Sequence, residues 1–108
     1  MISTHVLDTA RGHPAQGVPV TLEHDTGDGW QELAQAETDD DGRIRELVPG
    51  ELADGHYRLT FDTASYFRVV GDAAFYPQVS VVFTVAGAGH HHVPLLLSPF
   101  GYTTYRGS

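Results

Sequence analysis

The stretch VPLLLSPFGYTTYRGS, residues 93–108, decides the fold of this chain. An apolar run over 93–97 is followed by a turn at Ser98-Pro99-Phe100-Gly101, and aromatic and β-branched residues continue to the last positions. Such residues favour strands, whereas chain ends are usually poorly ordered. The pattern therefore predicts a hairpin whose second strand is paired almost to the end of the sequence.

The rest of the sequence has the same pattern of short strands separated by turn residues. Clusters of glycine and aspartate, such as 25–29 and 39–42, interrupt segments with alternating or β-branched character. Before the terminal strand, we expect strands over 3–8, 18–24, 30–36, 43–48, 56–62, 79–85 and 90–97. Only residues 63–70 have a helical pattern, which Thr63 can cap and Gly71 can end. The sequence thus predicts an all-β fold, an eight-stranded antiparallel β-sandwich or barrel with one short helix.

Length and composition limit the possible functions. A chain of 108 residues, 41% hydrophobic and 19% charged, fits a single domain over residues 1–108. The net charge of −8 argues against nucleic acid as a partner, because phosphate binding requires clustered Lys and Arg. No apolar run approaches the ~20 residues of a membrane span. With 0 cysteines and no export signal at Met1, we expect a cytoplasmic protein, or a periplasmic one if a signal peptide was removed.

The histidine run His90-His91-His92 has three interpretations. An expression tag is badly placed inside the chain. A metal site is incomplete, because residues two apart on a strand share a face but local spacing offers no third ligand. Strand alternation gives the third interpretation: alternate residues from Val93 face the core, and His91 joins them as a structural histidine. His92 then shares the opposite face with Pro94, where it is available to a ligand or a partner subunit.

The face opposite the core is unusually apolar for a solvated sheet. Pro94 and Leu96 stand where an exposed antiparallel strand normally carries polar residues. A sheet with two partly apolar faces needs a cover, and association of subunits is the simplest one. We therefore expect an oligomer from this patterning alone.

Four segments, in order, resemble the hydroxyisourate hydrolases, the enzymatic relatives of transthyretin. They are Thr4-His5-Val6-Leu7-Asp8 with Gly12 and Pro14, the Asp-Gly-Arg turn within 38–43, the strand 90–99, and the ending Tyr-Arg-Gly-Ser at 105–108. That strand usually carries His-Tyr-His before Val-Pro-Leu in the family, and His91 replaces the tyrosine here. The two flanking histidines are retained. Segments such as 75–77 also fit, so the resemblance covers essentially the whole chain.

The resemblance implies a transthyretin-like sandwich assembled as a homotetramer, a dimer of dimers, with active sites in a channel between dimers. The implied reaction is hydrolysis of 5-hydroxyisourate, the unstable product of urate oxidation, by opening of its six-membered ring at an amide bond. No cofactor and no metal are implied. By motif position, the catalytic residues are His5, Arg43 and His92, and the substrate-binding residues are His5, Arg43, Tyr105 and Ser108.

The same residue types suit this chemistry without the resemblance. Hydrolysis of a cyclic amide needs a base for water and donors for the developing oxyanion. A neutral histidine, His5 or His92, can be the base, and the sequence does not decide between them. Arg43 offers a planar fork of donors to ring carbonyls, and Tyr105 can hydrogen-bond to the ring or stack on it.

Two other functions are compatible with parts of the pattern. A transthyretin-like carrier would bind a small ligand without turnover. By the same resemblance, however, vertebrate carriers have lysine, glutamate and threonine-type residues in place of His5, Arg43 and His92, and lack the Tyr-Arg-Gly-Ser ending. A zinc-dependent hydrolase would use His90, His92 and His5 as ligands. The Asp39-Asp40-Asp41 run is best explained as a solvated turn, since a calcium loop needs further oxygen ligands at set spacing.

Overall fold

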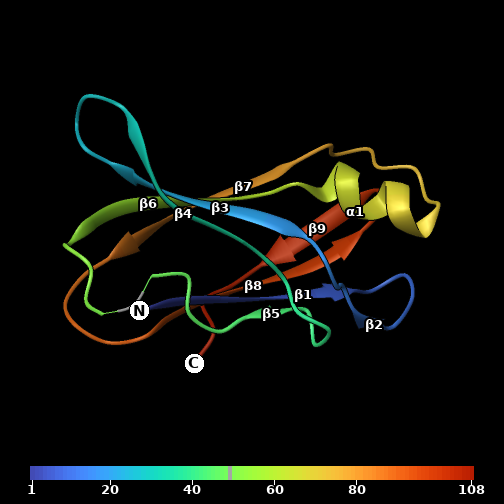
Figure 1. Cartoon of the computed structure of the whole chain (residues 1–108), viewed down its shortest axis with the longest axis horizontal. Coiled ribbons are helices and arrows are strands. Elements are labelled where there is room, and N and C mark those ends of the chain that lie inside the picture. Colours follow the sequence, from blue (N-terminus) through green and yellow to red (C-terminus); the bar gives the residue numbers. More distant parts are fainter. Residues whose placement is uncertain (49) are drawn as a thin grey trace.

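The fold consists of two β-sheets packed face to face with one short helix at an end, as Figure 1 shows. A computed structural model describes residues 1–48 and 50–108. Its elements are β1 (Ile2–Asp8), β2 (His13–Pro14), β3 (Pro19–Asp25), β4 (Trp30–Glu37), β5 (Arg43–Ile44), β6 (Gly55–Phe61), α1 (Thr63–Val70), β7 (Val79–Val85), β8 (His91–Ser98) and β9 (Gly101–Thr104). The prediction of an all-β sandwich with one short helix is confirmed.

Strand β1 occupies the centre of the first sheet. The strand order is β2-β1-β8-β9, and β5 also pairs with β1. The β1–β8 pair is parallel, so the expectation of an entirely antiparallel sandwich is corrected here. Parallel neighbours need a long crossover connection, and the whole second sheet and α1 lie between β1 and β8 in the chain. A pairing over such a distance leaves no local pattern in the sequence.

The hydrophobic core fills the space between the two sheets. The second sheet has the order β4-β3-β6-β7 and is antiparallel throughout. Both sheets contribute alternate side chains to the core: Ile2, Val6, Val93, Leu95 and Leu97 from the first, and Val20, Leu22, Tyr57, Leu59 and Phe61 from the second. Burial of each such side chain stabilises the fold by about 1.5–3 kcal/mol. The predicted core face of β8 is confirmed.

Two predictions about short strands are wrong. Strand β5 ends at Ile44 and not at Val48, because the chain bends at Arg45. The Leu47 backbone N–H then donates to the Ile2 carbonyl at 2.9 Å, and the Leu47 side chain joins the core. Strand β2 is additional and pairs with the end of β1, so the described chain has nine strands rather than eight. Two-residue strands are too short to show an alternating pattern.

Helix α1 spans the predicted residues, but its cap is Asp62 and not Thr63. The Asp62 carboxylate accepts the backbone N–H of Ser65 at 3.1 Å. Thr63 is buried, and its hydroxyl donates to the Tyr76 carbonyl at 2.6 Å. Gly71 ends the helix as predicted, with a φ of 84° in the left-handed region. Nowhere in the described chain is a helix long and apolar enough to cross a membrane.

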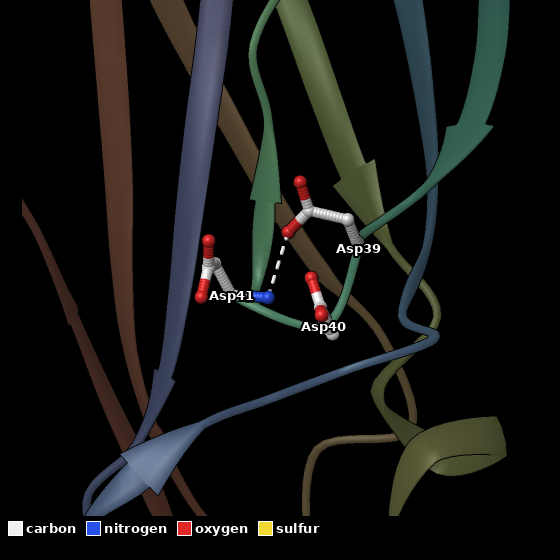
Figure 2. A group of neighbouring side chains, drawn as sticks. All are labelled: Asp39, Asp40 and Asp41. Atoms are coloured by element: carbon white, nitrogen blue, oxygen red, sulfur yellow. Dashed lines mark hydrogen bonds between the residues drawn. The ribbon is translucent and has the colours of Figure 1, made fainter.

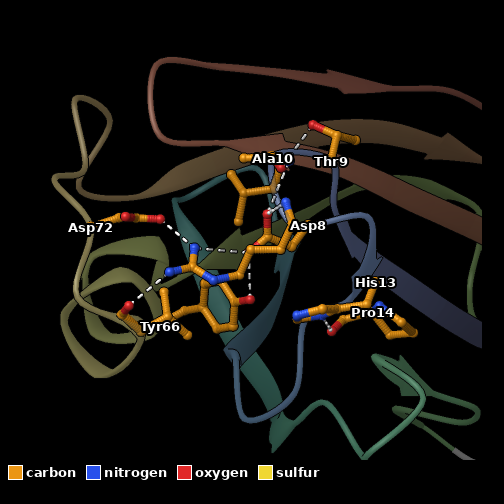
Figure 3. A network of polar contacts seen from close by, with 10 residues as sticks. Asp8, Thr9, Ala10, His13, Pro14, Tyr66 and Asp72 are labelled. Carbon is orange, nitrogen blue, oxygen red and sulfur yellow. Dashed lines mark hydrogen bonds and ion pairs between the residues drawn. The ribbon is translucent and has the colours of Figure 1, made fainter.

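A buried polar network, drawn in Figure 3, ties the end of β1 to α1. The Asp8 carboxylate is fully buried, accepts the Tyr66 hydroxyl at 2.6 Å and lies 3.7 Å from the Arg11 guanidinium. Arg11 also pairs with Asp72 and donates to the Val70 carbonyl at the end of the helix. Burial, followed by the hydrogen bond to Asp8, raises the pKa of Tyr66. Because a buried carboxylate needs donors, the network fixes the position of β1 in the sandwich.

Candidate active site

Strand β1 presents Ser3 and His5 on the face of the first sheet that points away from the core. His5 is paired with Arg43 of β5, and Ser3 is paired with His92 of β8. Paired residues of neighbouring strands project to the same face of a sheet. The register therefore gathers Ser3, His5, Arg43 and His92, which come from three separate segments of the chain.

The turn before Arg43 is built by aspartate and glycine. The Asp39 carboxylate accepts the backbone N–H of Asp41, as Figure 2 shows, and also that of Arg43, both at 2.9 Å. The bond from Arg43, more than any other contact, lowers the pKa of Asp39. Gly42 has a φ of 74° and accepts the Val6 N–H at 2.7 Å; a β carbon on Gly42 would overlap the Val6 carbonyl oxygen. The Asp-Gly-Arg sequence thus lets the turn approach β1 closely.

His5 is half-buried and oriented by this turn. Its Nε2 lies 2.9 Å from the Asp41 carbonyl oxygen. A carbonyl only accepts hydrogen bonds, so Nε2 carries the hydrogen, and Nδ1 is the free acceptor of the neutral ring. Burial, and then the charge of Arg43, lower the pKa of His5 below 6.5. The ring is therefore uncharged at neutral pH.

His92 is also half-buried, and its Nδ1 lies 2.7 Å from the Ser3 hydroxyl oxygen. The same oxygen lies 2.6 Å from Nε2 of His90. Burial, followed by the charges of His90, Arg43 and His5, lowers the pKa of His92 below 6.5. His92 is thus neutral at neutral pH, and its hydrogen bond to Ser3 leaves Nε2 for another partner.

A hollow of about 180 Å³ adjoins the cluster. It is lined by Ser3, Thr4, Arg43, Ile44, Arg45, His90, His92 and Ser108. Ser108 reaches it because Gly107 forms a bridge with His92, and Figure 1 shows the C-terminus close to the start of β1. Three predicted site residues, Arg43, His92 and Ser108, therefore meet at one hollow, and His5 lies beside Arg43.

Tyr105 is a predicted site residue that neither lines this hollow nor pairs with a residue that does. Strand β9 ends at Thr104, and Tyr105 is 55% exposed. It lines a separate hollow of about 220 Å³, to which Phe83 and His92 also contribute. Strand alternation does not fix the direction of a side chain beyond the end of its strand. The substrate-binding role of Tyr105 stays a prediction.

Ser3 is a site residue that the sequence patterns do not single out. It is only 4% exposed, and its hydroxyl contacts two histidines. Its position two residues before His5 was a usable signal, since both residues must share a face of β1. The pairing with His92 was not visible, because it depends on the parallel register of β1 and β8. His91, in contrast, is buried as predicted, with 8% of its surface exposed.

Potential metal ligands gather at one place in residues 1–48 and 50–108. The oxygens of Asp39, Asp40 and Asp41 lie within 4.8 Å of one another at the exposed turn in Figure 2. There the Asp39 carboxylate is already used by backbone N–H groups of the turn. In that described part, His5, His90 and His92 do not gather as a three-ligand set, and a hydroxyl lies between the last two. The ligand set of the zinc hypothesis is therefore not assembled.

Comparison with known families identifies the wider group. The model of the HIUase/Transthyretin family matches residues 2–107, from the first residue of β1 to the bridge with His92. The chain belongs to this family. A 5-hydroxyisourate hydrolase of Mus musculus is 48% identical over 99% of this chain and 94% of its own length. The resemblance inferred from four short segments is thus confirmed at the level of the whole chain.

Solved structures of the HIUase/Transthyretin family share this fold closely. A 5-hydroxyisourate hydrolase of Klebsiella pneumoniae has a TM-score of 0.89 and 36% identity, covering 99% of this chain and 98% of that one. Sea bream transthyretin in complex with thyroxine has a TM-score of 0.92 and 36% identity, covering 98% of this chain and 93% of that one. A hydrolase and a thyroxine-bound protein are therefore equally similar in backbone. Only the side chains of the site distinguish the two functions.

Proposed function

We propose that this chain is a 5-hydroxyisourate hydrolase that opens the six-membered ring of its substrate at an amide bond. The observation that carries the proposal is the meeting of a neutral histidine, His92, and a permanent positive charge, Arg43, at one hollow. The hydrolases among the relatives described above support it. The product is a ureido-imidazoline carboxylate, and the reaction uses water without a cofactor.

His92 is the general base of this mechanism. It lines the hollow, whereas His5 does not, and Nε2 of His5 is bound to the turn. Nε2 of His92 takes a proton from water while the water oxygen forms a bond to the ring carbonyl carbon. The oxyanion then collapses, the ring C–N bond breaks, and the leaving nitrogen receives the proton from His92. Such positioned proton transfer accelerates a reaction by roughly 100- to 10,000-fold.

Arg43 stabilises the oxyanion that forms during this attack. Its guanidinium stays charged and presents several N–H donors in a plane, which suits a carbonyl oxygen that becomes negative. His5 lies beside Arg43, and its Nδ1 can accept an N–H of the substrate ring. Ser108 at the hollow, and Tyr105 at its neighbour, supply further hydrogen bonds to the substrate. Together these groups orient the amide towards His92.

We also propose that the chain forms a homotetramer, a dimer of dimers, whose subunits enclose the site. Leu96 gives the outer face of β8 a half-buried apolar side chain on the side that carries His92, whereas Pro94 is already buried within the chain. The hollow of about 180 Å³ is smaller than the roughly 300–1,000 Å³ of typical ligand pockets, as expected for part of a shared site. Native mass spectrometry should give a mass of four chains. A fully active monomer would contradict the shared site.

The test of the proposed reaction is the ultraviolet decay of freshly generated 5-hydroxyisourate, made in place from urate with urate oxidase. The protein should accelerate the decay in proportion to its concentration. A transthyretin-like carrier is the second candidate, because thyroxine-bound sea bream transthyretin shares the backbone. Saturable thyroxine binding by the folded protein, without any acceleration of the decay, would favour the carrier. The cytoplasmic location stays a prediction that cell fractionation can test.

A further inference from the structure

The Ser3 hydroxyl joins two histidines on the outer face of the first sheet. Its oxygen lies 2.6 Å from Nε2 of His90 and 2.7 Å from Nδ1 of His92. Both distances are short for hydrogen bonds between a ring nitrogen and a hydroxyl oxygen. Ser3 is 4% exposed, and β1 fixes it through its pairing with His92 on β8. The three side chains thus form a continuous series of hydrogen bonds that ends at the exposed ring of His90.

When the Ser3 hydroxyl donates its one hydrogen to one ring and accepts from the other, this hydrogen-bonded series has two possible directions. In the first, His90 donates to Ser3 and Ser3 donates to Nδ1 of His92, which places the hydrogen of the neutral His92 ring on Nε2. In the second, Nδ1–H of His92 donates to Ser3 and Ser3 donates to Nε2 of His90. Only the second direction leaves a lone pair on Nε2 of His92.

We propose that Ser3 is a positioning residue which, with His90 as the terminal acceptor, holds His92 in the tautomer whose Nε2 is free to take a proton. The inference rests on the proposed function, because it explains what keeps the proton acceptor of that reaction in the required tautomer. When Nε2 of His92 is protonated, Nδ1–H continues to donate to Ser3. The hydroxyl therefore stabilises the charged ring without any proton moving along the chain.

The tautomer of His92 can be measured directly by nitrogen NMR of histidine-labelled protein, at a pH where the ring is neutral. The wild type should have hydrogen on Nδ1 and none on Nε2. In Ser3→Ala, which removes the acceptor, the hydrogen should shift to Nε2, whereas Ser3→Thr keeps the hydroxyl and should keep the wild-type tautomer. Ser80→Ala is the matched control, since Ser80 is a strand serine on the second sheet whose hydroxyl contacts Thr60.

The same variants should also differ in kcat. Ser3→Ala should lower kcat by roughly 10- to 100-fold, by analogy with the loss seen when the outer hydrogen bond of a metal-ligating imidazole is removed. KM should change little, and Ser3→Thr should restore kcat. His90→Ala should shift part of the His92 population to the other tautomer. His90 is exposed, so this variant tests the chain of contacts even if Ser3→Ala does not fold.

The tautomer of His92 decides whether the proposal about Ser3 holds. An Nε2–H form of His92 in the wild type, or an unchanged tautomer in both Ser3→Ala and His90→Ala, would overturn the proposal even if kcat falls. Failure of the proposed function is a separate result: the wild type would then not accelerate 5-hydroxyisourate decay, while the NMR experiment would still report the tautomer.

Discussion

The backbone of Gly107 packs directly against the imidazole ring of His92. The two residues form an antiparallel bridge in which the Gly107 N–H donates to the His92 carbonyl at 2.9 Å. A β carbon on Gly107 would overlap Cδ2 of the ring. The glycine of the Tyr-Arg-Gly-Ser ending is therefore a steric requirement of the residue that we propose as the base.

Gly107→Ala should displace the His92 ring and lower kcat by roughly 100-fold, because a catalytic group misplaced by about 1 Å can cost that much. Gly101→Ala is the matched control. Its β carbon would meet only the Ser98 hydroxyl oxygen, at an ordinary 3.7 Å. Steady-state kinetics and thermal unfolding of both variants give the comparison. A wild-type rate in Gly107→Ala would show that the close approach has no functional consequence.

The pH dependence of kcat/KM should have an acid limb centred below 6.5. Burial and the neighbouring charges lower the pKa of His92, so its ring loses the proton at a lower pH than an ordinary histidine. A general base works only when it is unprotonated. The rate should therefore begin to fall at a lower pH than an ordinary histidine base would give, and decline as the pH drops through the lowered pKa. A limb centred above 6.5 would contradict this assignment.

Replacement of Arg43 should separate its two effects on the site. The positive charge of Arg43 lowers the pKa of both His5 and His92. Arg43→Gln should thus move the acid limb to higher pH and also lower kcat. Arg43→Lys keeps the charge but not the planar fork of donors, so the limb should return while kcat stays low. Arg68→Gln, on an exposed position of α1, controls for the change in net charge.

An identical acid limb in wild type and Arg43→Gln would show that the guanidinium does not influence the base. The pH profile is the decisive readout here, because kcat alone would fall for either role of Arg43.

Tyr66→Phe should lower the free energy of unfolding by about 1–3 kcal/mol, because it leaves an oxygen of a buried carboxylate without its donor. That donor is the Tyr66 hydroxyl, 2.6 Å from the fully buried Asp8. Tyr76→Phe makes the same chemical change at a side chain that is 39% exposed and should have little effect. Denaturant unfolding measures both. Equal losses in the two variants would argue against a stabilising network at Asp8.

Strand alternation predicted much of the first sheet from the sequence alone. It placed Val93 and Leu95 in the core, buried His91 and turned His92 to the opposite face, and all four placements are confirmed. These placements succeed because the period of a strand is two residues. A shift of the strand by one residue would therefore turn its whole apolar set to the solvent.

The sequence did not reveal features that depend on contacts between distant segments. The parallel register that sets Ser3 beside His92 joins residues 89 positions apart and has no local signature. The sequence predicts Thr63 instead of Asp62 as the cap of α1, because neighbouring residues of capping type give the same signal. The direction of Tyr105 depends on where β9 ends, which local patterns predict poorly.

The role of His92 as the base for 5-hydroxyisourate hydrolysis can be tested by the ultraviolet decay of that substrate. Wild type and His92→Asn are compared at equal concentrations of folded protein. His56→Asn serves as the control, since His56 is an exposed histidine on the second sheet. We predict acceleration by wild type and His56→Asn, and a loss of at least roughly 100-fold in His92→Asn. Wild-type turnover by His92→Asn would show that His92 is not the base.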